Sequence, residues 1–275
     1  MASADEYTDE ETAMSESGKQ WQTAIGHPTE EQIYVRGYPV TDLIGRISFA
    51  SLVHLEFKGD LPSPGAERMI DALLVAVVEH GISPSSTVSR FLYASGVPLQ
   101  VAMAGGALTF GDIHGGAGQE FARVIQEAVT EADAHGRSIE DQATHLVQQA
   151  RADRQPLPGF GHPQHPQGDP RSPVLFALAE ETDTAGVHVK MARALEEALA
   201  GSIGRRIPLN IDGAMGAILS DLGFDWRLAR SFIVAPRMIG LAAHAIEEMD
   251  RHGGWRHIPL DEVSYDGPMD RVLDG

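Results

Sequence analysis

Three short segments of the chain combine residue types that could carry acid–base chemistry. His114 precedes two glycines, which let a ligand or another backbone approach closely. His162 follows a Gly-Phe-Gly sequence in a proline-rich stretch, and Asp212 stands where a helix is expected to begin. Two histidines and an aspartate can supply a base, an acid and a hydrogen-bond donor to a developing negative charge. These three residues are therefore the first candidates for a catalytic site.

Each candidate also has a simpler interpretation. His114 could be a buried histidine bonded to a backbone carbonyl, and Asp212 could cap the N-terminus of its helix. His162, His165 and Asp169 could instead ligate a metal ion, because HxxH is a familiar ligand spacing. Residue types and spacing alone do not name a reaction.

Amphipathic helices must position these residues. Ser63 and Pro64 open a helix as N-cap and first helical residue, and Gly81 ends it. Apolar residues recur within it at spacings of three and four. Similar patterns predict helices over 41–57, 98–110, 116–134, 138–152, 172–183, 187–200, 213–222 and 236–250. There is hardly any strand signal, so the sequence predicts an all-α fold.

One long stretch does not fit a helix. Residues 155–173 read QPLPGFGHPQHPQGDPRSP, in which proline and glycine are too dense for a regular element. A long loop made rigid by prolines is more often functional than idle in a compact domain. We therefore expect this loop, which carries His162, to form part of the site.

Composition narrows the classes of function. The chain has 275 residues, 43% of them hydrophobic, enough for a large buried core. No apolar run approaches a membrane span and no secretory leader is evident, while the absence of cysteine suits a reducing cytoplasm. The formal net charge of -18 argues against a nucleic-acid partner. An anionic substrate would need a local arginine cluster. Residues 1–22 are predicted to be a disordered acidic tail.

Several motifs, in order, resemble the citrate synthase superfamily from about residue 23 to 270. They are the RGYPV segment at 36–40, KGDLP at 58–62, HGGA at 114–117, GFGHP at 159–163, GDPR at 168–171, NIDG at 210–213 and APR at 235–237. His162 and Arg171 are nine residues apart, the separation that the family uses between its carbonyl-polarising histidine and a carboxylate-binding arginine. The order and spacing make the resemblance specific.

The resemblance implies a role for each residue. Asp212 would be the acid or base at the acetyl-CoA methyl group, His114 would donate a hydrogen bond to the thioester enol oxygen, and His162 would act at the ketone or hydroxyl. Arg171 and Arg237 would bind substrate carboxylates.

Two further roles follow from the same resemblance. Arg256 resembles the arginine donated across the dimer interface. The backbone of Leu157, Pro158, Gly159, Phe160 and Gly161 would line the coenzyme A adenine site. Coenzyme A enters as a thioester substrate, with no tightly bound cofactor and no metal expected.

The chain also departs from standard citrate synthases. It is short, and Ser86 stands nearest to the place where those enzymes carry another oxaloacetate-contacting histidine. The stretches EHG, GDIHGG and WRHIPLDEVSY look closer to the citryl-CoA lyase module of ATP-citrate lyase. The leading hypothesis is thus cleavage of citryl-CoA to acetyl-CoA and oxaloacetate. The alternatives are a citrate or 2-methylcitrate synthase, and a non-catalytic or metal-binding relative.

The resemblance also predicts the architecture. A large helical domain would comprise residues 23–114 and 226–275, and a small helical domain residues 115–225, with the catalytic groups at their junction. Small-molecule substrates, namely an acyl-CoA and a dicarboxylate or tricarboxylate, are the expected partners, with neither nucleic acid nor membrane. We expect a cytoplasmic homodimer or a higher homo-oligomer.

Overall fold

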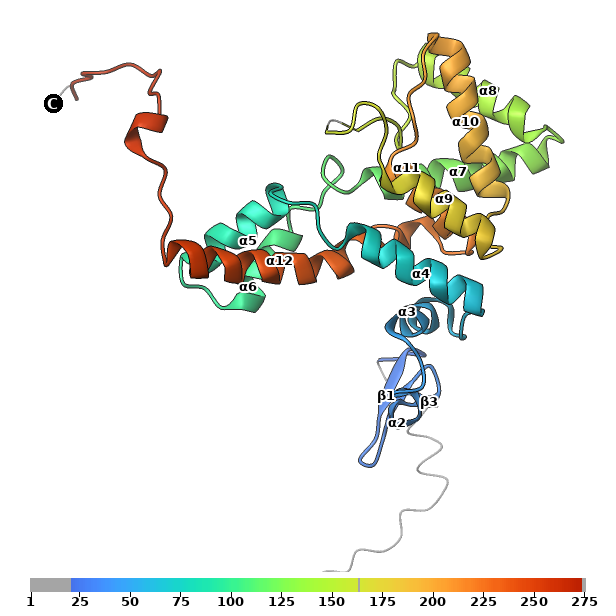
Figure 1. Ribbon diagram of the computed structural model, residues 1–275, viewed down its shortest axis with the longest axis horizontal. Coiled ribbons are helices and arrows are strands. Elements are labelled where there is room, and N and C mark those ends of the chain that lie inside the picture. Colours follow the sequence, from blue (N-terminus) through green and yellow to red (C-terminus); the bar gives the residue numbers. More distant parts are fainter. Residues whose placement is uncertain (1–20, 163, 274–275) are drawn as a thin grey trace, which may run out of the picture. The chain divides into compact units, whose positions relative to one another are not determined.

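The computed structural model describes residues 21–162 and 164–273 (Figure 1). The predicted acidic tail therefore lies outside the described residues, apart from Trp21 and Gln22. The chain separates into two compact units, one ending at Ile70 and the other beginning at Asp71. Within the described ranges, no helix combines the length and the apolar character needed to cross a bilayer.

The first unit carries a small antiparallel sheet that the sequence did not predict. Its strands, β1 (Gly26–Pro28), β2 (Ile33–Val35) and β3 (Tyr38–Pro39), pair in the order β1-β2-β3. Arg36 and Gly37, with φ of 49° and 87°, form the turn between β2 and β3, as expected for a two-residue hairpin. The Arg36 side chain donates from Nε to the Glu56 carbonyl at 3.0 Å. The RGY segment therefore builds and anchors a hairpin.

The single helix predicted over 41–57 is two helices. They are α2 (Val40–Leu43) and α3 (Phe49–Lys58). Ser48 begins the second one, because its side chain accepts a hydrogen bond from the Ser51 backbone N–H at 3.1 Å. The next helix, α4 (Pro64–Val77), begins where Ser63 and Pro64 predicted and ends three residues before His80.

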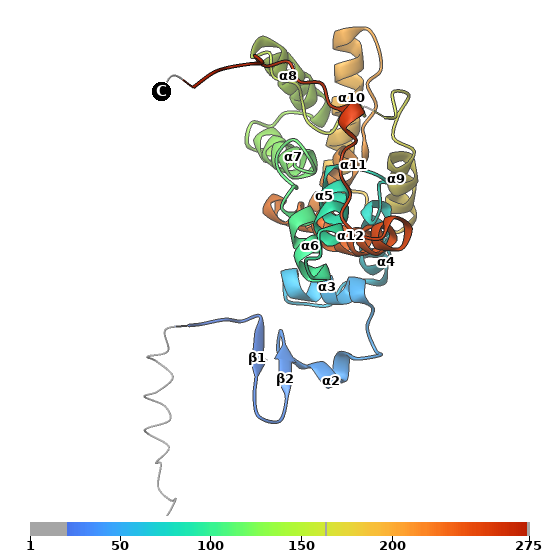
Figure 2. The ribbon, with the colours of Figure 1, turned by 90° about the vertical axis from the view of Figure 1, so that its left-hand side faces the viewer.

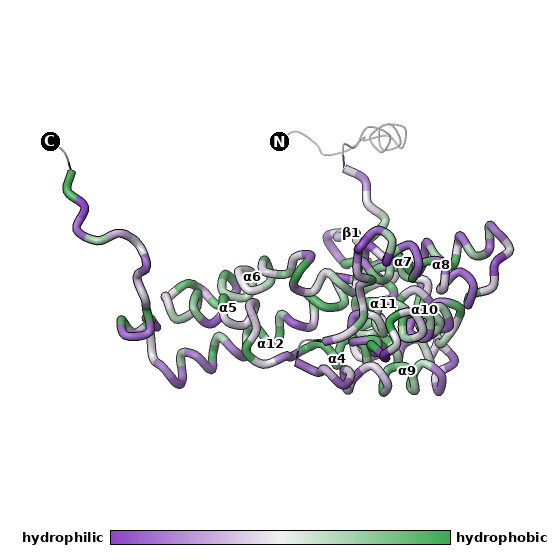
Figure 3. Tube along the Cα trace, turned by 90° about the horizontal axis from the view of Figure 1, so that it is seen from above, coloured by the Kyte–Doolittle hydropathy of each residue, from purple (hydrophilic) through white to green (hydrophobic). Residues whose placement is uncertain are grey.

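In the second unit, α7, α9 and α10 gather around α11, with α8 beside α10 (Figures 1 and 2). These helices are α7 (Ala117–Ala134), α8 (Ile139–Ala152), α9 (Arg171–Glu181), α10 (Val187–Ile203) and α11 (Ile211–Asp221). Almost every residue of α11 is buried, and Figure 3 shows hydrophobic segments around it. A Cβ on Gly216 would lie 3.0 Å from the Gly118 carbonyl, so glycine is what allows α7 and α11 to approach so closely.

A second set of helices packs together in the same unit. It comprises α5 (Pro84–Ala94), α6 (Leu99–Ala107) and α12 (Ser231–His252). Two 3-10 turns, η1 (Trp226–Leu228) and η2 (Leu260–Glu262), lie before and after α12. The all-α class is confirmed, while the predicted division at residues 23–114, 115–225 and 226–275 stays a prediction.

Candidate active site

A cavity of about 350 Å³ in the second unit brings five of the predicted site residues together. Its walls come from the segment after α4, the loop between α6 and α7, the proline-rich loop, the start of α11 and the first half of α12. The titratable residues that line it are His80, His114, His162, Arg171, Asp212 and Arg237. All three predicted catalytic residues and two of the three predicted arginines therefore face one space.

His114 lies in the loop between α6 and α7. Its ring stacks on Phe110 with centroids 4.7 Å apart, and its Nε2 lies 3.2 Å from the Ser85 hydroxyl. Gly115 takes the left-handed conformation that completes the turn, with φ of 79°. Burial lowers the pKa of His114, and the nearby charges of Arg237 and His80 lower it further. The ring is therefore held neutral, with one N–H to donate.

Asp212 is the second residue of α11 and is not the helix cap. Asn210 caps the helix, because its Oδ1 accepts from the Gly213 N–H at 3.1 Å. The Asp212 carboxyl lies at the cavity wall, where loss of water raises its pKa, although Arg171 and the Gly118 N–H act in the opposite direction. A carboxyl whose pKa is raised can carry a proton and deliver it.

The proline-rich loop holds His162 through contacts with the segment before α11. The Gly161 N–H donates to the Pro208 carbonyl and the Asn210 N–H donates to the Gly159 carbonyl, both at 2.9 Å. A Cβ on Gly159 would lie 2.9 Å from the Gly213 Cα, so glycine is needed there for close packing. Gly161, with φ of 68°, takes the left-handed conformation that a tight turn requires. The loop thus fixes His162 in the cavity that Asp212 also lines.

The neutral state of His162 is defined by its neighbours. The Gln164 N–H donates to its Nδ1 at 3.2 Å, so a neutral ring in this position carries its proton on Nε2. Burial lowers the pKa of His162, against the attraction of Asp169. The ring therefore presents an N–H that suits the carbonyl oxygen of a ketone.

Asp169 joins Arg171 to the start of α11. Its carboxylate accepts from Nε and Nη2 of Arg171 at 2.9 and 2.8 Å and from the Ile211 N–H at 3.2 Å. Burial alone would raise the pKa of Asp169, but these bonds outweigh it and hold the pKa at about 2. This fixed carboxylate orients the arginine and the turn that carries Asp212 together.

Arg237 is the most buried cation of the cavity, with 6% of its surface exposed. Its Nε donates to the Val77 carbonyl at 2.8 Å, and its guanidinium lies 5.9 Å from the Phe110 ring centroid. Burial lowers its pKa, as does Arg171, while Glu79 raises it. Two arginines in a half-enclosed space are the local cationic site that an anionic substrate requires.

Some predicted residues lie elsewhere. Arg256 lies outside this cavity, where its Nη1 contacts the buried Glu248 at 3.2 Å. Leu157 and Pro158 line a different hollow, against α7 and α8. Phe160 packs edge-on against Phe121, and the Gly161 amide is already used. The assignment of residues 157–161 to adenine binding stays a prediction, although the Gly161 amide is not open to a ligand.

Sequence reasoning missed His80. It lies just after α4 on the cavity wall, and its ring stacks 5.6 Å from that of His162. Ser86, which was expected nearest to an additional substrate-contacting residue, is buried and donates to the Gly81 carbonyl at 2.9 Å. In the sequence, His80 stands in the EHG stretch shortly after the end of α4.

Comparison with known proteins now identifies the family. The family model described as "Citrate synthase, C-terminal domain" matches residues 57–257, well over half of the chain. The chain belongs to the citrate synthase family. It is an enzyme of that family, and its matched segment contains every residue that lines the cavity.

Individual relatives agree with this assignment. The citryl-CoA lyase of Hydrogenobacter thermophilus superposes with a TM-score of 0.86 at 37% identity, covering 93% of this chain and 98% of that one. The ATP citrate lyase of Methanosaeta concilii, solved with (3S)-citryl-CoA, has a TM-score of 0.74 at 20% identity over 98% of this chain and 47% of its own, and supports the fold. The glyoxysomal citrate synthase of Cucurbita maxima is 29% identical over 197 residues, covering 69% of this chain and 36% of the relative. The chain spans less than half the length of the Cucurbita and Methanosaeta proteins.

Proposed function

We propose that this citrate synthase-family enzyme is a citryl-CoA lyase, which cleaves citryl-CoA to acetyl-CoA and oxaloacetate. The observation that carries the proposal is the likeness to the Hydrogenobacter citryl-CoA lyase across nearly the whole of both chains. The site supports it, because one cavity holds a proton donor, a neutral histidine donor and two arginines for carboxylates.

The proposed cleavage assigns one task to each side chain. His162 takes the proton of the tertiary hydroxyl, the carbon–carbon bond breaks, and its electron pair moves into the thioester as an enolate. His114 donates to the enolate oxygen, and Asp212 gives its proton to the carbon, which becomes the acetyl methyl group. The raised pKa of Asp212 suits this last step, because the carboxyl must hold a proton until the bond breaks.

The proton on His162 must move during this sequence. With Nδ1 accepting from the Gln164 N–H, Nε2 is a donor, which suits the ketone of oxaloacetate. To take the hydroxyl proton, an unprotonated ring nitrogen of His162 must face the hydroxyl group. That nitrogen is Nδ1, so the ring must first break its weak contact with the Gln164 N–H. The same site run backwards would condense acetyl-CoA with oxaloacetate, which is the first half of a synthase reaction.

A citrate synthase is the second candidate, and the likeness to the Cucurbita citrate synthase favours it. The two differ in whether the thioester is hydrolysed. Citryl-CoA, and separately acetyl-CoA plus oxaloacetate, would be offered to the enzyme while acetyl-CoA, oxaloacetate and free CoA are measured. A lyase gives acetyl-CoA and oxaloacetate from citryl-CoA with little free CoA. Rapid release of free CoA from acetyl-CoA plus oxaloacetate would contradict the lyase proposal and indicate a synthase.

We also propose a homodimer. Arg256 lies outside the cavity of its own chain, where it contacts Glu248. In addition, α6 contains small residues that suit close packing of a second helix, and the exposed surface of Leu108 follows it. Sedimentation equilibrium tests this, and a fully active monomer would contradict it. A cytoplasmic location stays a prediction.

A further inference from the structure

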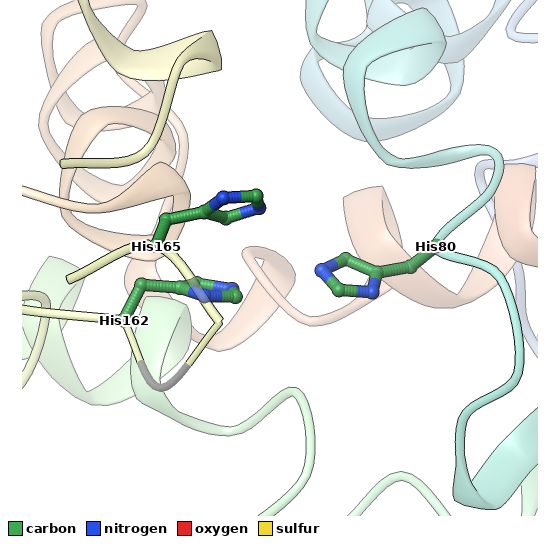
Figure 4. Close-up of side chains that lie close together, drawn as sticks. All are labelled: His80, His162 and His165. Carbon is green, nitrogen blue, oxygen red and sulfur yellow. The ribbon is translucent and has the colours of Figure 1, made fainter. Parts of the chain in front are cut away.

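Three histidines converge beside the cavity, and two of them, His80 and His162, line it. His162 and His165 come from the proline-rich loop, and His80 faces them from the segment after α4 (Figure 4). One ring nitrogen from each lies within 4.8 Å of the others. The ring centroids of His162 and His165 are 4.6 Å apart, and those of His80 and His162 are 5.6 Å apart. All three residues are half-buried, so each remains partly exposed to solvent.

This donor set suits a divalent transition metal. Imidazole nitrogen binds zinc, copper, nickel and cobalt, and three imidazoles with one open position form a recognised zinc geometry. Zinc–nitrogen bonds of about 2.0–2.1 Å in a tetrahedron place the nitrogens roughly 3.3 Å apart. The ring nitrogens, which lie within 4.8 Å of one another, would therefore have to move closer together on binding. A hard cation such as Mg²⁺ would instead require oxygen ligands.

The hydrogen bonds and charges around the three histidines determine how favourable metal binding is. A metal on Nε2 of His162 would place the proton on Nδ1, so the contact from the Gln164 N–H, 3.2 Å long, would be lost. Arg171 and Arg237 repel a cation, whereas Glu79 and Asp169 attract one. The net charge of -18 also favours cations near the protein. The charges near the cluster thus roughly cancel. Whether a cation binds is therefore determined mainly by its bonds to the three imidazoles.

We propose that His80, His162 and His165 bind a divalent transition-metal cation, with Zn²⁺ as the best match, and that the bound cation inhibits the enzyme. Inhibition rests on the proposed function, because a metal held by His162 occupies the group that handles the hydroxyl proton. Metal binding itself does not depend on which reaction the site performs.

His165 allows the two roles to be separated. It is absent from the walls of the cavity that holds His114, Asp212 and both arginines, so the proposed cleavage does not use it. His165→Gln removes one ligand and changes none of the residues that the proposed cleavage uses, although the His162 ring loses its neighbour at 4.6 Å. His145 on α8 is an exposed histidine outside the cluster, and His145→Gln is the matched control.

The first measurement is direct binding without substrate. Chelator-treated parent, His165→Gln and His145→Gln proteins would be titrated with Co²⁺, and the visible absorption of tetrahedral Co²⁺ recorded. The parent and His145→Gln should bind one Co²⁺ per chain, and His165→Gln should bind at least about tenfold more weakly. Equal binding by parent and His165→Gln, or no saturable binding by the parent, overturns the metal site.

The second measurement is turnover of citryl-CoA in the presence of Zn²⁺. Zn²⁺ should inhibit the parent and His145→Gln at the same concentration, with recovery on addition of chelator, and His165→Gln should need at least about tenfold more. Saturable Co²⁺ binding with undiminished turnover overturns the inhibitory role. Saturable binding in a protein that does not cleave citryl-CoA, even metal-free, upholds the site and contradicts the proposed function.

Discussion

At the scale of single residues, the site depends on groups held in chosen protonation states. Burial makes His114 a neutral donor and Asp212 a carboxyl that retains its proton more readily. The sequence predicted both residues, because each stands in a motif with glycine beside it. It could not predict His80, since a histidine after a helix gains meaning only when the fold brings it to His162.

Removing the proposed enolate donor should slow turnover with little change in fold. His114→Ala should lower kcat for citryl-CoA cleavage by about 10²–10³, the usual effect of losing one donor to a developing oxyanion. Steady-state kinetics would measure it, with His145→Gln as a control expected to turn over like the parent. A threefold change or less would mean that His114 has only a packing role against Phe110.

Replacing Asp212, the proposed proton donor, should separate binding from chemistry. Asp212→Asn keeps the shape of the side chain but cannot exchange a proton, so kcat should fall while substrate binding stays near that of the parent. Exchange of the acetyl-CoA methyl protons in deuterated water, with and without a dicarboxylate, tests this directly. If the variant exchanges and turns over like the parent, the assignment of Asp212 is wrong.

At the scale of elements, periodicity predicted most helices but few of their ends. The helix α5 was missed because serines fill its first turn, and only Ser83 and Pro84 mark its start. The helix α12 begins five residues before the predicted 236, because Pro236 lies inside it and was read as its first residue. Strands of two or three residues are too short to show a pattern. Contacts across the chain, such as that of Gly159 with Gly213, are likewise invisible in sequence.

That contact predicts a difference between two glycines of similar conformation. Gly159 and Gly136 have φ of 81° and 59°, but a Cβ would meet nearby atoms only at Gly159. Gly136→Ala should cost only the strain of its backbone, on the order of 1 kcal/mol, while Gly159→Ala should cost about 1–3 kcal/mol more from overpacking. Urea unfolding measures both. Equal losses of stability would show that the loop yields easily around Gly159.

Asp169 predicts how the stability of this junction depends on pH. Its pKa is about 2 in the folded protein against an ordinary 3.8, so its contribution is complete above pH 3.8 and is lost as the pH falls through about 2. Asp169→Asn should therefore be less stable at pH 6, by about 1–3 kcal/mol for bonds to a charged group, and the difference should shrink below pH 3.8. Urea unfolding at several pH values tests this, with Asp133→Asn at an exposed position as control. A difference that does not depend on pH would contradict the assignment.

At the scale of the whole molecule, the proposed function requires an acidic chain to bind an acidic substrate. The net charge of -18 opposes the approach of a carboxylate. Arg171 and Arg237 give the cavity a local positive charge that offsets this repulsion. The family resemblance in the sequence predicted these two cations and their shared site. It also predicted a third, Arg256, which the chain places outside its own cavity. A second copy of the chain is what could bring Arg256 to a site.

Mixing two inactive variants tests this arrangement. Arg256→Ala should leave a folded but weakly active enzyme, and Asp212→Asn should be nearly inactive. If Arg256 acts in the partner's site, a mixed dimer of the two has one site with both defects and one site with neither. After subunit exchange at equal amounts, about half of the dimers are mixed, so activity should recover to roughly a quarter of that of the parent. Thermal unfolding of each variant would show that it is folded before mixing. Activity that remains the simple average of the two variants, despite subunit exchange shown by sedimentation or labelling, would place Arg256 in a purely structural role beside Glu248.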